Sequence, residues 1–204
     1  MLLRAMRRRP PTPNESMTWL IVGLGNPGRG YAATRHNVGY LVADALAERV
    51  GGRWKKHKSG RADVIEGRLA GERVVLGRAR SYMNESGGPV SALAKFYDID
   101  PERIVAIHDE LDIDFGQLRI KLGGGDNGHN GLKSMRQSLG TGDFHRVRVG
   151  IGRPPGRQEV HDFVLKPYAS VEKKELPVYV EEAADAVESL ITKGLAETQQ
   201  AFNR

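Results

Sequence analysis

The chain has 204 residues, 39% of them hydrophobic and 27% charged, so it is long enough for one ordinary domain with a buried core. It contains no cysteine, which excludes disulfide frameworks, thiolate zinc sites and cysteine nucleophiles and suits a cytoplasmic location. The net charge of +6 favours an anionic partner, and no apolar run approaches the roughly 20 residues that a membrane-spanning helix needs.

Residues 1–16 form a basic tail with neither helical nor strand periodicity. Four arginines and three prolines favour a disordered segment, and the tail lacks the apolar stretch of a secretory signal, so we do not expect export. Either the arginines contact nucleic acid, or translation starts at Met17, just before the first strand-like segment. We favour the second interpretation, because a disordered start adds nothing to a core. We assign residues 17–204 to one domain.

The rest of the chain alternates between strand-like and helix-like segments. Apolar or alternating patterns predict strands over 18–25, 62–69, 72–79, 103–110, 117–122 and 145–152. Apolar residues at three- and four-residue spacing predict helices over 38–50, 90–97, 131–139 and 177–195. This interleaving predicts a single three-layer αβα domain of the α/β class, with a mixed, mostly parallel central sheet and one hairpin. Functional residues of such sheets gather in loops at strand ends, and the polar or glycine-rich loops here are 25–37, 80–88, 108–114 and 123–130.

The segment GLGNPG, residues 23–28, matches the G-x-G-x-x-G pattern of dinucleotide-binding proteins. That fingerprint requires a helix at the loop and an acidic residue closing the second strand. Here residues 29–31 have the composition of a loop, and Asp44 falls inside the predicted helix. A nicotinamide-dependent oxidoreductase is therefore a weak alternative. What the loop offers is Asn26, an amide donor and acceptor on a glycine-flanked turn.

His36 lies in a loop just before the first predicted helix. A lone histidine is most often structural, but its place at the expected active edge favours acid–base chemistry. A histidine base needs an acceptor to orient it, and Asp109, at the end of an apolar strand, is placed to accept its hydrogen bond. The acidic segment 108–114 has two other interpretations, a solvated turn and a divalent-cation site of His108, Asp109 and Asp112. No second histidine at ligand spacing supports the cation.

Two further loops run into helices and carry asparagine. The segments are SYMNESGG, with Asn84, and GGGDNGHNG, with His129 and Asn130. These residues either cap the helices or, with the backbone N–H groups of the glycine loop, bind a ligand. Three loop asparagines and a histidine favour recognition of a polar backbone such as a peptide. Because the chain has no G-x-S-x-G or Walker A motif, the chemistry we expect is activation of water.

The basic charge is concentrated in the middle of the chain. Residues 115–157 carry eight basic and two acidic side chains, whereas residues 158–204 carry five basic and nine acidic ones. The basic pairs that share a strand face are Arg119 with Lys121, and Arg146 with Arg148. Such charges usually form a solvated face, but paired cations beside glycine loops can hold phosphate. A non-catalytic RNA-binding protein is therefore a second alternative.

Five segments in order resemble the bacterial-type peptidyl-tRNA hydrolase family: LIVGLGNPG…YAATRHNVG, SYMNESG, HDELD, KLGGGDNGHNGLK and FHRVRVGIGRP. The resemblance runs from about residue 18 to the C-terminal helix. It implies a monomeric enzyme, without cofactor or metal, that hydrolyses the ester between a peptide and the terminal ribose of tRNA. It also implies that His36 is the catalytic base, that Asp109 orients it, and that Asn26 positions the scissile carbonyl or stabilises the oxyanion.

The resemblance extends to substrate-binding positions. It implies that the peptide main chain and the 3′ end of the tRNA contact Asn84 and Asn130, and that the cleft is lined by Tyr31, Met83 and His129. The basic pair that grips the 5′ phosphate of tRNA would be Lys121 and Arg148. Two features depart from the family pattern. Glu85 replaces a small or hydrophobic residue, and the approach GRARSYMN lacks the Lys-Pro often found there.

Overall fold

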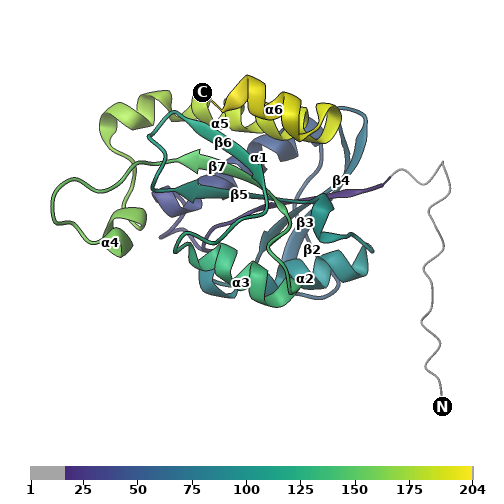
Figure 1. Cartoon of the computed structure of the whole chain (residues 1–204). Coiled ribbons are helices and arrows are strands. Elements are labelled where there is room, and N and C mark those ends of the chain that lie inside the picture. The colour runs from purple at the N-terminus through teal and green to yellow at the C-terminus, as the bar shows by residue number, and fades with distance from the viewer. Residues whose placement is uncertain (1–16, 204) are drawn as a thin grey trace, which may run out of the picture.

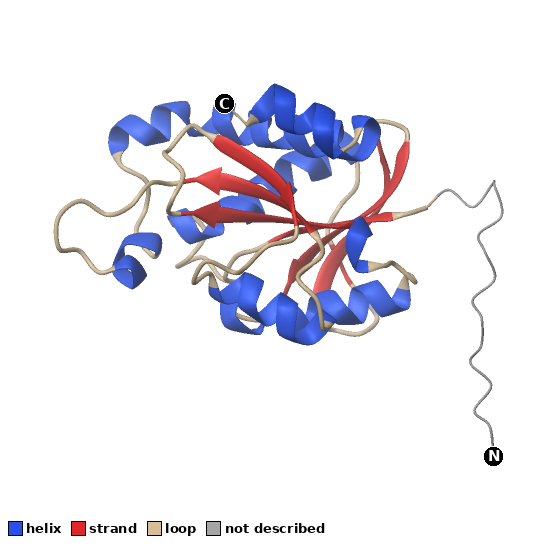
Figure 2. Ribbon diagram, in the orientation of Figure 1, coloured by secondary structure: helices blue, strands red, loops and turns tan. Residues whose placement is uncertain are grey.

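The central sheet has seven strands in the order β2-β3-β4-β1-β5-β7-β6 (Figures 1 and 2). The computed structural model describes residues 17–203, so the predicted tail 1–16 lies outside the described residues. The strands are β1 (Trp19–Gly23), β2 (Lys55–Lys56), β3 (Ala62–Leu69), β4 (Glu72–Ala79), β5 (Ile104–Glu110), β6 (Leu118–Leu122) and β7 (His145–Gly150). The four strands β4, β1, β5 and β7 run parallel, whereas the pairs toward both edges are antiparallel. The predicted mixed sheet is confirmed.

Helices cover both faces of this sheet. They are α1 (Val38–Val50), α2 (Gly87–Phe96), α3 (Asn130–Leu139), α4 (Val160–Val164), α5 (Ser170–Lys193) and α6 (Leu195–Phe202), with 3₁₀ turns η1 (Arg35–Asn37), η2 (Met83–Glu85) and η3 (Pro101–Arg103). Helices α1, α5 and α6 pack on one face, and α2 and α3 pack on the other (Figure 1). Alternate strand residues point into the two cores, so Ile21 belongs to one and Leu20 to the other. No helix within residues 17–203 is long and apolar enough to cross a membrane.

Most predicted elements are confirmed, but the helix expected over 177–195 begins seven residues earlier, at Ser170, and ends at Lys193. Pro177 lies inside this helix rather than at its start. Pro177 is exposed, so its ring points to solvent and the helix tolerates the hydrogen bond lost with its N–H. The helix begins earlier because Glu172 accepts the backbone N–H of Ala169 at 2.9 Å. The elements β2, α4 and α6 were not predicted, because they are too short to show a clear period.

Glycine at positions 39 and 23 allows α1 to lie closer to the sheet than a residue with a side chain at either position would permit. A Cβ atom on Gly39 would lie 2.4 Å from the carbonyl oxygen of Ile107, and one on Gly23 would lie 2.3 Å from the carbonyl oxygen of Gly39. The helix therefore begins directly above the ends of β1 and β5. Its approach brings the preceding turn η1, with His36, beside the end of β5, and it gives Gly23 a packing role instead of the dinucleotide-binding role weighed above.

Candidate active site

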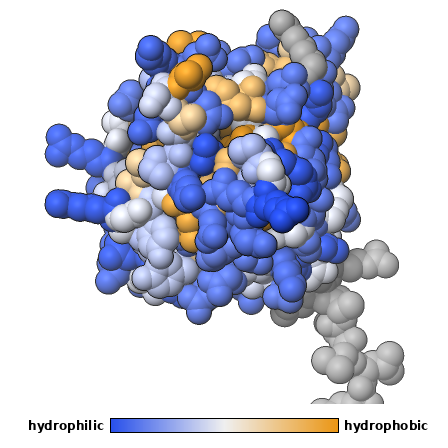
Figure 3. All heavy atoms as spheres, turned by 90° about the vertical axis from the view of Figure 1, so that its left-hand side faces the viewer, coloured by the Kyte–Doolittle hydropathy of each residue, from blue (hydrophilic) through white to orange (hydrophobic). Residues whose placement is uncertain are grey.

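A cavity of about 460 Å³ lies at the carboxyl ends of β1 and β5, on the face drawn in Figure 3, where apolar side chains are surrounded by hydrophilic ones. Loops 25–37, 80–88 and 108–114 reach it as predicted, because they follow parallel strands. Loop 123–130 starts at the opposite edge, since β6 runs antiparallel to β7, and returns to the cavity before α3. Eight predicted site residues line the cavity: Asn26, Tyr31, His36, Met83, Asn84, Asp109, His129 and Asn130.

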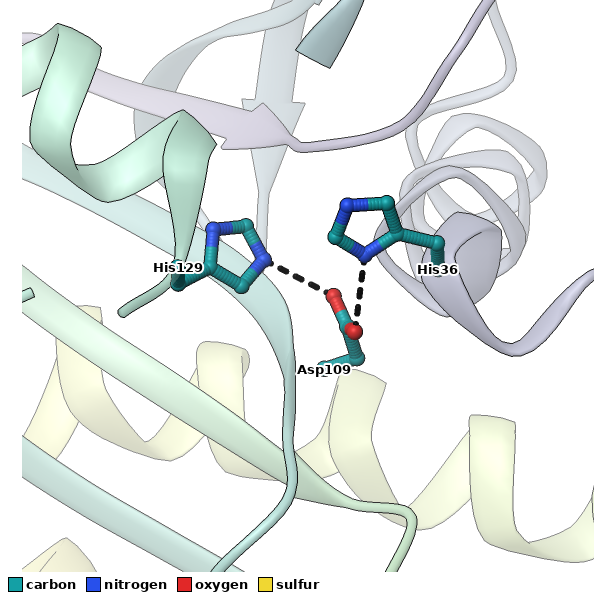
Figure 4. A group of neighbouring side chains, drawn as sticks. All are labelled: His36, Asp109 and His129. Atoms are coloured by element: carbon teal, nitrogen blue, oxygen red, sulfur yellow. Dashed lines mark hydrogen bonds and ion pairs between the residues drawn. The ribbon is translucent and has the colours of Figure 1, made fainter. Parts of the chain in front are cut away.

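Asp109 lies between two imidazoles (Figure 4). Its side chain is only 3% exposed, and Oδ2 accepts a hydrogen bond from Nδ1 of His36 at 2.8 Å. Oδ1 accepts a second hydrogen bond from Nε2 of His129, also at 2.8 Å. The predicted contact between His36 and Asp109 is therefore confirmed. The contact with His129 was not predicted, because it depends on the path by which the glycine-rich loop returns across the sheet.

His129 also caps α3, as one of the sequence interpretations predicted. Its Nδ1 accepts the backbone N–H groups of Gly131 at 3.1 Å and Leu132 at 3.3 Å. A ring nitrogen that accepts these bonds carries no proton, so the proton lies on Nε2 and faces Asp109. The helix cap thus fixes one neutral tautomer of His129.

The charges of this cluster are set by burial and by the carboxylate. Burial acts to lower the pKa of His36, but the charge and the hydrogen bond of Asp109 outweigh it, so the pKa of His36 is raised. Burial acts to raise the pKa of Asp109, yet its interactions with His36 and His129 hold that pKa well below its usual range. His108 is fully buried behind them, and burial lowers its pKa to about 3. Asp109 is therefore ionised and His108 neutral at physiological pH.

Asn26 is held rigidly by its neighbours. Its backbone N–H and carbonyl both bind the side-chain amide of Asn37, at 2.8 Å each. Its own Oδ1 accepts the backbone N–H of Met83 at 2.7 Å. Since the oxygen of the amide is engaged, the side-chain nitrogen of Asn26 is the group that remains to donate a hydrogen bond within the cavity.

Asn84 and Asn130 lie exposed at the cavity mouth. The sequence left open whether they cap helices. Helix α2 begins without a side-chain cap and α3 is capped by His129, so neither asparagine has this role and the capping interpretation is wrong for both. Glu85, the residue that departs from the family pattern, is exposed.

Arg35 fastens the turn that carries His36 to the C-terminal part of the chain. Its guanidinium donates to the carbonyl oxygen of Phe163 at 3.2 Å and to Glu172 at 3.3 Å, and it lies 4.0 Å from the centre of the Phe163 ring. Phe163 belongs to α4, whose residues Val160 and Val164 form an apolar wall of the cavity. Sequence reasoning missed this connection because the partners lie more than 120 residues apart.

Lys121 and Arg148 do not line this cavity. They lie in a neighbouring one of about 380 Å³, which shares Glu110 and Asn127 with the first. Lys121 pairs in register with Arg146, and Arg119 pairs with Arg148, so all four basic side chains lie on one face of the sheet. Burial lowers the pKa of Lys121, and the neighbouring arginines add to the effect.

Arg146 has a different environment from the other three cations. It is fully buried and donates hydrogen bonds to carbonyl oxygens of Gly124 at 2.8 Å, Gly142 at 3.1 Å and Gly125. Arg146 therefore holds the glycine-rich loop against β7, and Lys121 and Arg148 line the same cavity beside it.

The cluster His36, Asp109 and His129 has the composition of a metal site, with candidate ligand atoms within 4.8 Å of one another. Their arrangement is that of hydrogen bonds, because the cap on α3 places a proton between His129 and Asp109. The divalent-cation site considered in the sequence analysis had other members, namely His108, Asp109 and Asp112, and the structure engages two of them elsewhere. His108 directs Nδ1 to the backbone carbonyl of Asp109, and Asp112 binds Arg153 at 2.6 Å.

Comparisons with known proteins agree on one family. The model of the family described as peptidyl-tRNA hydrolase matches residues 20–204. The peptidyl-tRNA hydrolase of Frankia alni is 59% identical over 191 residues, and the match covers 94% of this chain and 96% of that protein. The peptidyl-tRNA hydrolase of an Arthrobacter species is 60% identical over 188 residues, and the match covers 91% of this chain and 96% of that protein. The crystal structure of peptidyl-tRNA hydrolase from Acinetobacter baumannii superposes with a TM-score of 0.85 at 38% identity, covering 92% of this chain and 95% of that one. The chain therefore belongs to the peptidyl-tRNA hydrolase family, whose members are carboxylic ester hydrolases.

Proposed function

We propose that this protein hydrolyses the ester between a peptide and the 3′-terminal ribose of tRNA, with His36 as the general base that activates water. The hydrogen bond between His36 and Asp109 carries the proposal. Because Nδ1 of His36 donates to Asp109, the lone pair lies on Nε2, which is available to accept a proton from water. His36 lines the cavity, so a water beside it is close to a bound ester.

Asp109 serves this step in two ways. It holds the imidazole of His36 in one tautomer, and its negative charge stabilises the imidazolium that forms when His36 takes the proton. His129 supports the arrangement, because its hydrogen bond to the second carboxylate oxygen keeps Asp109 from rotating. We assign His129 as a positioning residue.

Asn26 supplies the donor for the developing oxyanion. Its amide nitrogen is fixed before substrate arrives, since the oxygen of the same amide is bound to Met83. A preorganised donor of this kind contributes about 10²–10³ to the rate of acyl transfer. The described residues that line the cavity include no serine, threonine or cysteine, which favours direct attack by water over a covalent intermediate.

The remaining site residues bind substrate. The exposed amides of Asn84 and Asn130 suit the main chain of the peptide and the 3′ end of the RNA, and Tyr31 and Met83 line the cleft. Recognition through main-chain groups suits an enzyme that accepts many peptide sequences. The cations Lys121 and Arg148 suit the 5′ phosphate of tRNA, since they lie together in the adjacent cavity.

The test is release of the acylated amino acid from an N-acetyl-aminoacyl-tRNA. We expect His36→Ala to slow release by about 10²–10⁴-fold, the usual contribution of a general base. His57→Gln is the matched control, because His57 binds Ser59 and lies outside the cavity. Equal rates for wild type and His36→Ala would refute the mechanism. Salt-sensitive tRNA binding without any ester cleavage would instead favour the RNA-binding alternative.

A further inference from the structure

A second cavity lies on the other side of Asn26, and the mechanism above does not use it. Its volume is about 460 Å³, equal to that of the first, and Asn26 stands in the walls of both. The other walls come from the loop after β1, the first turns of α1 and the ends of β3 and β4 that face the active site. Whatever binds in this cavity therefore lies beside the group that we assign to the oxyanion.

Three arginines line the second cavity. Arg29 is exposed, and its guanidinium has no hydrogen bond or ion pair with any residue in the part of the chain that the structure describes. Arg80 binds Asp63 at 2.8 Å, and Arg78 binds Asp44 at 2.9 Å. Asp44 is 50% exposed, and ion pairs at such positions contribute only about 0–1 kcal/mol. A phosphate can therefore replace Asp44 as partner of Arg78 at little cost, and Arg80, whose side chain is 47% exposed, is open to a second partner besides Asp63.

The second cavity also has a flat wall, which is the ring of Tyr40. The guanidinium of Arg78 lies 4.1 Å from the centre of the Trp54 ring and 5.5 Å from that of Tyr40. The hydroxyl of Tyr40 donates to the carbonyl oxygen of Ala79 at 2.7 Å, which fixes the ring in the wall. Aromatic rings and guanidinium planes are the surfaces on which unpaired bases stack, and guanidinium groups are the preferred partners of phosphate. Cations beside flat surfaces suit a nucleotide.

The three cavities form a row across the strands, with the third lying over the face of β6 and β7. The second is bounded by β4 and the loop after β1, the first lies at β1 and β5, and the third lies at β6 and β7. Neighbouring cavities share residues, and strands lie about 4.8 Å apart, so the row spans roughly 14–19 Å. Cations stand at both ends of the row, with His36 between them. A phosphate bound at either end therefore lies one cavity away from His36.

We infer that the second cavity is a subsite for a nucleotide of the unpaired 3′ strand of the substrate RNA. Arg29 and Arg80 bind its phosphate, and its base lies against the wall formed by Tyr40. Arg78 and Arg80 come from GRARSYMN, the segment that lacks the Lys-Pro often found in the family. The inference rests on the proposed function for the identity of the RNA, but the binding itself can be measured separately.

The binding experiment uses adenosine 5′-monophosphate as probe and the full chain labelled with ¹⁵N. In wild type we expect amide shifts at Arg29, Tyr40 and Ala79, and we expect Arg29→Gln/Arg80→Gln to weaken binding about fivefold or more. The control Arg68→Gln/Arg73→Gln removes the same charge from the far end of the β3–β4 hairpin and should bind as wild type does. Shifts confined to the other two cavities, or equal affinity in the double variant, would overturn the subsite.

Kinetics then identify the source of the nucleotide. With N-acetyl-aminoacyl-tRNA, Arg29→Gln/Arg80→Gln should raise KM about fivefold or more and leave kcat within about twofold, because the subsite binds but does not react. If the monophosphate binds the cavity but KM is unchanged, the assignment to the substrate's own strand is wrong. Failure of the wild type to cleave the ester would overturn the proposed function alone, since the titration still reports on the cavity.

Discussion

His129 joins helix α3 to Asp109: one nitrogen of its ring accepts the N–H groups of the first helical turn, and the other donates to the carboxylate at 2.8 Å. The same side chain thus serves a structural and a functional contact. Because the first bond fixes the tautomer that the second requires, the helix cap determines how Asp109 is held.

Two substitutions of His129 separate these contacts. Asparagine is a good N-cap but is too short to reach Asp109, whereas alanine loses both interactions. We expect His129→Ala to lower the free energy of unfolding by about 1 kcal/mol and His129→Asn to change it little. Both variants should lower kcat for N-acetyl-aminoacyl-tRNA. Denaturant unfolding and steady-state kinetics check this, and full activity in His129→Asn would contradict the positioning role.

The pH dependence of kcat/KM reports on His36. Only the neutral imidazole is a base, and Asp109 raises its pKa, so kcat/KM should rise with pH through that raised pKa and level off above it. Asp109→Asn removes the charge that raises the pKa and leaves the burial that lowers it. The acid limb should then move to lower pH, while the plateau falls by about 10²–10⁴-fold. A pH–rate profile of both proteins tests this, and an unmoved limb would separate Asp109 from His36.

Asn26→Asp tests the oxyanion donor. The carboxylate still accepts from Met83 but offers no N–H, so kcat should fall by about 10²–10³-fold with a small change in KM. Asn203 is a matched control, because its Oδ1 accepts the N–H of Ile120 at 2.7 Å outside the cavity. Asn203→Asp should retain the wild-type kcat. A similar loss in both variants would point to a general effect of the new charge.

Lys121→Ala and Arg148→Ala should raise KM for full-length tRNA substrates and leave KM for short 3′-terminal fragments unchanged, because fragments lack the 5′ phosphate. Loss of one phosphate contact should also reduce the salt slope of tRNA binding by about 1. Arg73→Ala, on the far part of β4, is the control. Equal losses with full-length tRNA and with fragments would show that the two cations act near the ester.

Gly39→Ala tests the close packing of α1. The new methyl group would meet the carbonyl oxygens of Ile107 at 2.4 Å and Leu24 at 2.5 Å, and both are backbone atoms that cannot rotate away. We expect a loss of about 1–3 kcal/mol in the free energy of unfolding, measured with denaturant. Gly30→Ala is the control, because no atom lies within 4 Å of its Cβ position. Equal stability of the two variants would show that α1 can shift.

Local patterns in the sequence predict the parts of this fold that local forces determine. The helix 38–50 and the strands 62–69 and 72–79 have the predicted bounds, because a left-handed Gly51 ends the helix and the positive φ angles of Ala70 and Gly71 form the hairpin turn. The meeting of His36 with Asp109 also follows from simple topology, since parallel strands end at one edge.

Contacts that depend on the return path of a loop were not predictable from one sequence. His129 reaches Asp109 only because Arg146 holds the glycine-rich loop against the sheet, and no local period encodes that bond. The helix preference of residues 170–176 was hidden by Pro177, although the side chain of Glu172 already marks the helix start. A tertiary bond decided the first case, and a local cap decided the second.

The bond between Arg35 and Glu172 has a consequence for the order in which the molecule is assembled. The chain leaves the ribosome with its N-terminus first, so Glu172 emerges more than 130 residues after Arg35. Until α5 has emerged and packed on α1, the turn that carries His36 lacks this anchor. A growing chain therefore contains His36, Asp109 and His129 well before the anchor of the His36 turn can form.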